Sequence, residues 1–438
     1  MKKKNAMALL PIGVFLVLYL GLGIVFEYGL KLEMGFYKIP IVVVFLIALG
    51  VACLQNRALP FEKKLEVMSK GVGDKNIVTM ILIFLVAGMF VGVVGRSSAE
   101  SVAYFVLSFI PAQFSVLVLF VVSAFVSLAM GTSVGTITLL APIALAVAEG
   151  SGFPVPICLG TVVGGAMFGD NLSFISDTTI AACNGQGCEM KDKFRENFKI
   201  ALPAATVTLI WLAVTTVKAE AVHPVMKEYQ LVQIVPYLLV LAGGIFGLNV
   251  FLVLIIGIVS GSVIMVASGH TPLTELLANM GTGASGMFET AMVAVLVSAI
   301  CALIAEHGGF EALLSMIRKV FRGRKGGTIG MGLLVGAMDI ATANNTVAIV
   351  MANPIAKEMS QEYGISPKRA ASILDTFSCV FQGILPYGAQ MLVAISVAAG
   401  VGIRVSAFEI IPHLVYPFVL GICLIIITLF DNKGKKKN

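Results

Sequence analysis

The chain has 438 residues, of which 58% are hydrophobic and only 12% are charged, and its mean hydropathy is +0.97. Apolar runs of about 17 to 25 residues, the length that crosses a bilayer, recur along it and leave no room for a sizeable soluble domain. The net charge of +6 is assigned to loop lysines that orient membrane spans, which excludes a nucleic-acid partner. The sequence therefore predicts an all-α polytopic membrane protein.

Residues 1–217 are predicted to form five spans, of which the fourth is broken. Uninterrupted spans are expected at 6–26, 39–54, 76–95 and 200–217, with a piece lying at the membrane interface at 98–110. A helical hairpin at about 114–149 is expected to enter the bilayer without crossing it, and a broken helix follows at about 156–183. The N-terminus and the loops at 56–75 and 185–199 are rich in lysine and arginine, so the positive-inside rule assigns them to the cytoplasm.

A connector at 218–229, expected outside the cytoplasm, precedes a second run of similar elements at 230–430. It is predicted to contain spans at 231–246, 249–266, 286–305 and 408–430, a polar loop at 268–283 and an amphipathic stretch at 310–321. A hairpin at about 328–360 and a broken helix at about 370–400 lie before the last span. A basic tail at 431–438 is expected in the cytoplasm, which gives ten spans and two hairpins.

The two hairpin regions can be superposed from Pro142 and Pro354. Both prolines are followed by Ile-Ala, and glycine stands ten residues later in each case, at Gly152 and Gly364. Loops that correspond in this register alternate between basic and poorly charged. This pattern predicts two inverted repeats of about five spans each, with one re-entrant hairpin and one broken helix per repeat. The alternative is that similar hydropathy merely imitates a repeat.

Four polar clusters lie at matching places in the two halves. They are GTSVGT (131–136) and DIATANNT (339–346) at the hairpin tips, and GDNLSFISDTT (169–179) and QGILPYGAQ (382–390) at the helix interruptions. Polar side chains at membrane depth are costly unless they bind an ion, a proton or a substrate. The candidate ion- or substrate-binding residues are Asp170, Asn171, Ser173, Ser176, Asp177, Thr178, Thr132, Ser133, Thr136, Asn344, Asn345, Thr346, Asp339, Asp375, Gln382 and Tyr387.

Asp170 and Asp177 are the proposed Na⁺ ligands among these residues. Glycines that precede Asp170 are expected to break the helix there and to turn carbonyl and side-chain oxygens toward a cation. Asp170 is assigned as the cation ligand and exchangeable proton site, because a carboxylate at membrane depth can balance Na⁺ or H⁺ in alternation. Asp177 is assigned either as the second ligand or as the cap of the following half-helix.

Other candidates also keep an alternative. Asp375 either forms a second ion site or hydrogen-bonds Thr376 or Ser378, and Tyr387 either contacts an organic substrate or packs against other aromatic rings. The seven cysteines lack a CxxC pattern and neighbouring histidines, so we interpret them as packing residues and expect no metal cofactor. No GxxxxGK[ST] motif occurs, which argues against an ATP-driven pump.

The strings GTSVGT, GDNLSFISDTT, EMKDKF and TANNT together resemble the NhaC-type Na⁺/H⁺ antiporter family of the ion transporter superfamily. The resemblance covers nearly the whole chain and implies a Na⁺-linked secondary transporter with inverted repeats, in the bacterial inner membrane. It carries over to Asp170, Asn171, Ser173, Asp177 and Thr178. Phe174 and Val134 stand where the family pattern has proline and tryptophan, as in a shorter branch similar to permeases for amino acids such as histidine.

The expected function is therefore secondary active transport, with no enzymatic activity and no cofactor besides the coupling ions Na⁺ and H⁺. Na⁺/H⁺ antiport at a midplane carboxylate is the first hypothesis. The alternative is Na⁺- or H⁺-coupled transport of an amino acid or a small carboxylate. Both hypotheses place a multi-pass protein in the cytoplasmic membrane with its two termini inside, and a homodimer is a further hypothesis.

Overall fold

A computed structural model describes residues 4–32, 38–55, 57, 59–174, 176–218, 228–246 and 248–430. Helices form all the regular structure of these residues, so the predicted all-α polytopic class is confirmed. Most of the predicted connector, residues 219–227, and the basic tail at 431–438 lie outside the described residues.

The described residues of the first half form ten α-helices, and short 3₁₀ and π turns flank the first two. They are α1 Leu10–Leu16, α2 Leu22–Ile24, α3 Ile41–Leu54, α4 Phe61–Val72, α5 Lys75–Phe109, α6 Ser115–Met130, α7 Ser133–Ser151, α8 Val155–Leu172, α9 Asp177–Gln186 and α10 Met190–Lys218. The second half contains α11 Leu231–Ile245, α12 Val250–Ala267, α13 Leu273–Gly286, α14 Phe288–Glu306, α15 Gly309–Val320, α16 Gly323–Thr342, α17 Asn345–Glu362, α18 Pro367–Ile384, α19 Ala389–Gly400, α20 Ala407–Ile410 and α21 Val415–Phe430.

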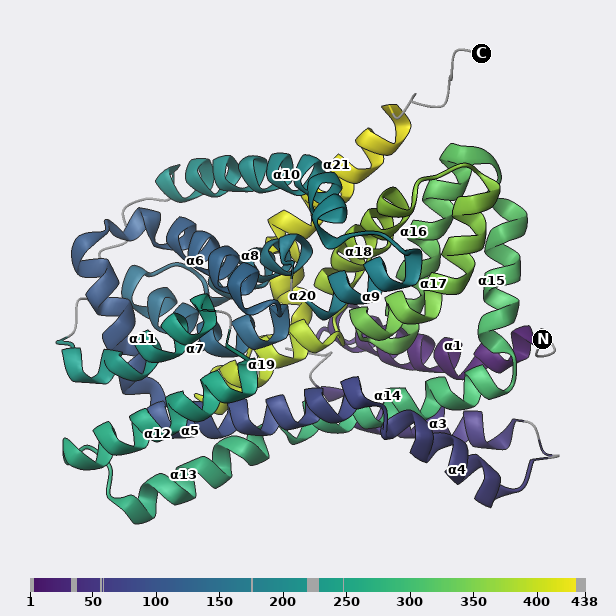
Figure 1. The fold of residues 1–438 in the computed structure, drawn as a ribbon. Helices are drawn as coiled ribbons and strands as arrows, with labels where there is room; N and C mark the ends of the chain where they lie inside the picture. Colours follow the sequence, from purple (N-terminus) through teal and green to yellow (C-terminus); the bar gives the residue numbers. More distant parts are fainter. Residues whose placement is uncertain are drawn as a thin grey trace.

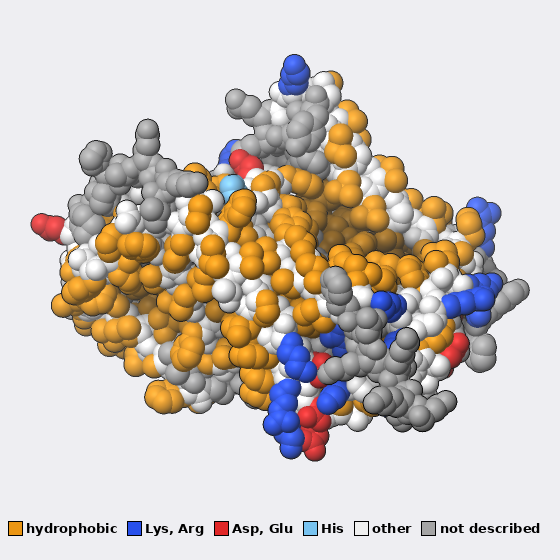
Figure 2. All heavy atoms as spheres, turned by 90° about the horizontal axis from the view of Figure 1, so that it is seen from above, with side chains coloured by type: hydrophobic (Ala, Val, Ile, Leu, Met, Phe, Trp, Pro, Cys, Tyr) orange, Lys and Arg blue, Asp and Glu red, His pale blue; other side chains and the backbone are white. Residues whose placement is uncertain are grey.

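Among the described residues, nine helical segments are long and apolar enough to cross a membrane. A tenth is obtained if Ala407–His413 and Val415–Leu429, bent by 54°, count as one span. Figure 2 shows one face of the molecule covered mostly by hydrophobic side chains, with the visible lysines, arginines and acids mainly along its margins. A surface of this kind suits contact with lipid, because apolar patches of that extent are rare on soluble monomers.

A constant offset of 212 residues relates the hairpin and the broken helix of the two halves. Helix α7 begins at Ser133 and α17 at Asn345, α8 begins at Val155 and α18 at Pro367, and α9 and α19 follow the same register. This offset is the one obtained from Pro142 and Pro354. The opposite threading of the two halves across a membrane stays a prediction.

Helices of each half pack against the other half. Helix α9 of the first half packs on α17 and α18 of the second, while α19 of the second half packs on α7 of the first. Likewise α4 packs on α14 and α13 packs on α5. In Figure 1, α6, α7 and α8 lie on one side and α16, α17 and α18 on the other, with α9 and α19 between them. The polar ends of all four half-helices therefore meet in the middle of the molecule.

Two segments differ from their sequence-based descriptions. The expected loops at 56–75 and 268–283 contain the helices α4 and α13, which begin directly after Pro60 and Pro272. Proline suits this place because the first turn of a helix does not need its N–H. The expected interfacial piece at 98–110 continues α5 beyond a bend at Gly95 (φ 59°) and packs on α7, and its placement at the membrane interface stays a prediction.

The glycines of α8 serve close packing. Gly165 and Gly169 lie inside the helix, and a Cβ at Gly169 would lie 2.4 Å from the carbonyl oxygen of Ala124 on α6. The expectation that these glycines break the helix was therefore wrong, because the break comes later, between Leu172 and Asp177. Small residues at such an interface let two membrane helices approach closely.

Candidate functional site

The two hairpin tips have the same local geometry. Gly131 (φ 68°) and Ala343 (φ 48°) adopt the left-handed conformation that ends α6 and α16. The next residues, Thr132 and Asn344, cap α7 and α17 by accepting hydrogen bonds from Gly135 N and Val347 N. Side-chain oxygens are favoured at this position because they satisfy backbone N–H groups that the helix leaves unpaired. Each tip thus turns within two residues and directs a helix N-terminus inward.

The break between α8 and α9 is fixed by Ser176. Its hydroxyl caps α9 by accepting from Thr179 N, and it also donates to the carbonyl oxygen of Asp170 (3.1 Å). Asp177 is the first residue of α9, and its side chain is exposed to the cavity described next. The suggestion that Asp177 itself caps the half-helix was wrong, because Ser176 fills that place.

A cavity of about 320 Å³ lies where the two tips meet this break. Its lining contains eight of the candidate residues, which come from both halves of the chain: Thr132, Ser133, Asp170, Asp177, Thr178, Asn344, Asn345 and Thr346. The remaining lining residues are Lys75, Thr79, Met80, Ile83, Gly131, Val134 and Asn249. Carboxylate, hydroxyl and amide oxygens are the ligands that hard cations prefer.

Asp170 is the buried carboxylate of this cavity. The Ser133 hydroxyl donates to Asp170 Oδ2 at 2.6 Å, and Asn345 Nδ2 lies 3.5 Å from the same atom. Ser133 is the first residue of α7, so the positive end of that helix faces the carboxylate. A hydroxyl, an amide and a helix N-terminus thus surround the buried carboxylate of this site.

A chain of hydrogen bonds connects Asp170 to the second broken helix. Gln390 Nε2 donates to Ser133 Oγ (3.0 Å), and Gln382 Nε2 donates to Gln390 Oε1 (2.9 Å). Gln382, which the repeat matches with Asp170, therefore reaches the cavity through Gln390. The register given by Pro142 and Pro354 already matched Gln382 with Asp170. The hydrogen bonds that connect them through Gln390 could be found only from the three-dimensional structure.

A second buried cluster surrounds Asp375. Lys193 Nζ lies 2.7 Å from Asp375 Oδ2, and the amides of Asn171 and Asn197 donate to the same oxygen at 2.9 and 2.8 Å. The side chains of Lys193 and Asp375 are 1% and 0% exposed. Asn171 thus belongs to this cluster, while its neighbour Asp170 faces the cavity. The expected hydrogen bond of Asp375 with Thr376 or Ser378 is replaced by others, since Lys193 and two amides hold its Oδ2 and Ser378 donates to Asp339.

Four other candidates lie off the cavity lining, and three of them bind backbone carbonyls. The hydroxyls of Ser173, Ser176 and Thr136 donate to carbonyl oxygens of Leu128, Asp170 and Thr132. Asp339 is buried, with Oδ1 accepting from Ser378 Oγ at 3.0 Å.

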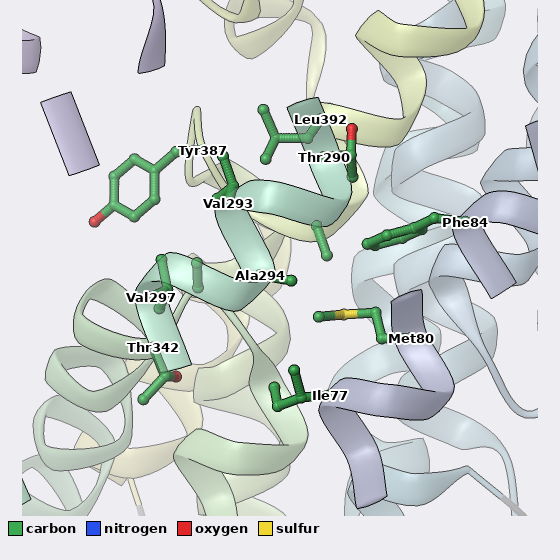
Figure 3. A pocket seen from close by; sticks show the side chains of 12 residues that line it. Ile77, Met80, Phe84, Thr290, Val293, Ala294, Val297, Thr342, Tyr387 and Leu392 are labelled. Atoms are coloured by element: carbon green, nitrogen blue, oxygen red, sulfur yellow. The ribbon is translucent and has the colours of Figure 1, made fainter. Parts of the chain in front are cut away.

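Tyr387 lies in an aromatic group. Its ring meets those of Phe15, Tyr19 and Phe45 edge to face, and its hydroxyl donates to the carbonyl oxygen of Ile340 (2.8 Å). The neighbouring pocket has a volume of only about 10 Å³ and a mostly apolar lining (Figure 3). This arrangement matches aromatic packing, the alternative stated for this residue.

Phe174, the departure from the family pattern, is 45% exposed and stacks on Phe194 with ring centroids 4.4 Å apart. It does not line the 320 Å³ cavity. Val134, the other departure, does line it.

Sequence reasoning missed Lys75 and Asn249 in the cavity and Lys193 and Asn197 beside Asp375. Lys193 was assigned to a cytoplasmic loop, whereas it lies in the first turn of α10 and is buried. One signal was available: Lys193 and Asn197 are four residues apart and continue the buried face of α10, which includes Ile200 and Ala204. This signal was overlooked because the positive-inside rule assigned the whole lysine-rich stretch to a cytoplasmic loop.

A sequence profile described as the Na⁺/H⁺ antiporter family matches residues 40–217 and 219–431. The "Malate-2H(+)/Na(+)-lactate antiporter" of Bacillus subtilis (strain 168) is 27% identical over 207 residues, which cover 47% of this chain and 42% of that protein, so the chain spans less than half of that relative. The "Na(+)/H(+) antiporter NhaC" of the same organism is 24% identical over 377 residues, which cover 78% and 83%. A solved structure entitled "Crystal structure of the Alcanivorax borkumensis YdaH transporter reveals an unusual topology" is 14% identical with a TM-score of 0.41 and covers 81% and 85%.

Proposed function

Because this chain belongs to the Na⁺/H⁺ antiporter family, we propose that it exchanges Na⁺ for H⁺ across a bacterial cytoplasmic membrane, with the two cations competing at Asp170. It is a multi-pass membrane protein of a transporter family. The observation that carries the proposal is a single buried carboxylate at the wall of a polar cavity, where both hairpin tips and a helix break converge.

The mechanism follows from the charge of Asp170. An ionised carboxylate in a poorly solvated place requires a compensating cation, and Na⁺ and H⁺ each meet that requirement. Hydroxyl and amide oxygens of Thr132, Ser133 and Asn345 lie on the same cavity and would complete the shell of a Na⁺ ion. A proton needs only one oxygen of Asp170. The empty carboxylate is the costly state, and this cost couples release of one cation to binding of the other.

Asp177 is proposed as an outer ligand of the same cavity. Asp177 is exposed whereas Asp170 is buried, so water solvates the charge of Asp177. Substitution of Asp177 should therefore leave the buried site intact. We expect it to attract cations toward Asp170 rather than to hold the exchanged proton.

The first prediction concerns Asp170→Asn in proteoliposomes that carry a pH-sensitive dye inside. An outward or inward Na⁺ gradient should drive proton movement with the unchanged protein. The asparagine variant should fall to the level of protein-free liposomes, because a neutral amide binds neither cation by charge. Asp177→Asn should retain exchange but need more Na⁺ for half of the maximal rate.

Asp192→Asn serves as the matched control, because Asp192 lies at the start of α10 outside the cavity lining. Sodium-driven proton movement that persists in Asp170→Asn would refute the assignment. Labelled malate, lactate and arginine are added to the same vesicles. Sodium-dependent entry of one of these solutes without proton movement would replace antiport by the alternative of organic-solute transport.

A further inference from the structure

The ammonium group of Lys193 sits among oxygen atoms as a small cation would. Its Nζ lies 2.7 Å from Asp375 Oδ2, 2.9 Å from the carbonyl oxygen of Asn171 and 2.6 Å from Thr179 Oγ1. These partners come from α18, the end of α8 and the start of α9, so the ammonium joins both sides of the first helix break to the second half of the chain. Three acceptors match its three N–H donors.

Within the described part of the chain, three buried oxygens of the same cluster lack a hydrogen-bond partner. They are Asp375 Oδ1, Asn171 Oδ1 and Asn197 Oδ1. Buried polar atoms are nearly always satisfied, so three orphaned acceptors around one carboxylate need an explanation. All are acceptors, and what satisfies a group of acceptors is a cation or a proton donor.

We propose that the Asp375 cluster is a second site for a small monovalent cation such as Na⁺, and that the Lys193 ammonium occupies it in this conformation. The three oxygens around Nζ, together with the three unpartnered ones, amount to six candidate ligands. Rotation of the Asn197 amide exchanges its NH₂ group for its oxygen without any movement of the backbone. An ion that enters would therefore find an oxygen shell once Lys193 withdraws.

Electrostatics couples the departure of the Lys193 ammonium from Asp375 to the arrival of another cation. A buried acid that loses its partner is strongly destabilising, so Lys193 leaves Asp375 only when another cation takes its place. The cluster is also separate from the cavity of Asp170, since neither Lys193 nor Asp375 lines it. At the offset of 212 residues, Asp375 corresponds to Val163 and Lys193 to Val405, so the charged pair has no equivalent in the other repeat.

The test uses the purified full-length chain in an Asp170→Asn background, which removes cation binding at the first cavity. Lys193→Met keeps the aliphatic stem and leaves the place of Nζ open. The melting temperature of Asp170→Asn/Lys193→Met is measured in NaCl and in N-methyl-D-glucamine chloride at equal ionic strength. We expect Na⁺ to raise it by about 3 °C or more, and Asp170→Asn alone to show no such difference.

Adding Asp375→Asn to the double variant is the matched control, and it should abolish the effect of Na⁺. A folded double variant that melts at the same temperature in both salts would overturn the proposal. The proposal would also be overturned if Lys193→Met and Lys193→Ser gave no monodisperse protein in NaCl while Lys193→Met/Asp375→Asn did. In that case Na⁺ would not replace the ammonium group. Neither outcome depends on transport, so this test is independent of the antiport assigned to Asp170.

Discussion

Asp170 and Asp375 are both buried carboxylates, but their surroundings give them different chemistry. Asp375 faces a lysine ammonium and two amide donors, so its charge is balanced within the protein. Asp170 is held by a hydroxyl and a more distant amide at the wall of an open cavity whose lining also contains Lys75, so a cation that enters can approach its charge. A few side chains around each carboxylate thus determine whether an ammonium group of the protein or a cation in the cavity balances its charge.

The second prediction concerns the two left-handed residues at the hairpin tips. Alanine at this φ is strained by roughly 1 to 2 kcal/mol, whereas glycine is not. Ala343→Gly should therefore stabilise the protein by about 1 kcal/mol or somewhat less, because the more flexible unfolded chain offsets part of the gain. Gly131→Ala at the equivalent tip should destabilise it by a similar amount. Thermal unfolding in detergent measures both, and equal signs for the two variants would contradict the argument.

At the scale of elements, α6 and α8 pack closely because glycines on α8 admit the backbone of α6. Helices in lipid gain little from burying apolar side chains, so close backbone approach supplies much of their attraction. This packing fixes the end of α8, and with it the position of Asp170 in the last turn of that helix.

The third prediction is that Gly169→Ala destabilises the protein by about 1 to 3 kcal/mol, the usual range for overpacking. The added Cβ would meet Ala124 O and Leu128 N, which are backbone atoms and cannot rotate away. Gly281→Ala on α13 is the matched control, since nothing lies within 4 Å of its Cβ and alanine favours helix there. Thermal stability in detergent should fall for the first variant and hold or rise for the second. If both variants changed the thermal stability alike, the close contact at Gly169 would not contribute to stability.

At the scale of the whole molecule, each half completes the other. Helix α9 packs on α17 and α18, and α19 packs on α7, so neither half encloses the 320 Å³ cavity alone. Gln186 and Asn353 connect α9 to α17 through a hydrogen bond of 2.9 Å. A change in one half is therefore transmitted to the lining supplied by the other.

The fourth prediction tests whether the two halves are threaded in opposite directions. Lys191 is exposed in a segment assigned to the cytoplasm, and Arg322 is exposed in a basic stretch that the positive-inside rule places on the same side. Arg404 is exposed in the segment that the repeat assigns to the other side. In a background without native cysteines, Lys191→Cys and Arg322→Cys should react with a membrane-impermeant maleimide only in inside-out vesicles, and Arg404→Cys only in intact cells. Labelling of positions 191 and 404 from the same side would rule out inverted threading.

Much of this architecture could be predicted from the sequence because its determinants are local. Apolar runs of span length require helices in lipid, and Pro142, Pro354 and the glycines that follow them give the 212-residue register of the repeat. Four polar clusters at membrane depth predicted the cavity, since such groups are costly without a ligand. Asp170 and most of the residues around it were found in this way.

Only the tertiary structure decided which polar groups meet. Lys193 read as a loop lysine because its partner, Asp375, lies in the other half of the chain and no local pattern connects them. Asn171 and Asp170 are neighbours in sequence but face different clusters, since successive residues of a helix point about 100° apart. Tyr387 joined an aromatic group contributed by the N-terminal helices. Local chemistry determined where polarity occurs, and packing between distant segments determined which charges are balanced and which await a cation.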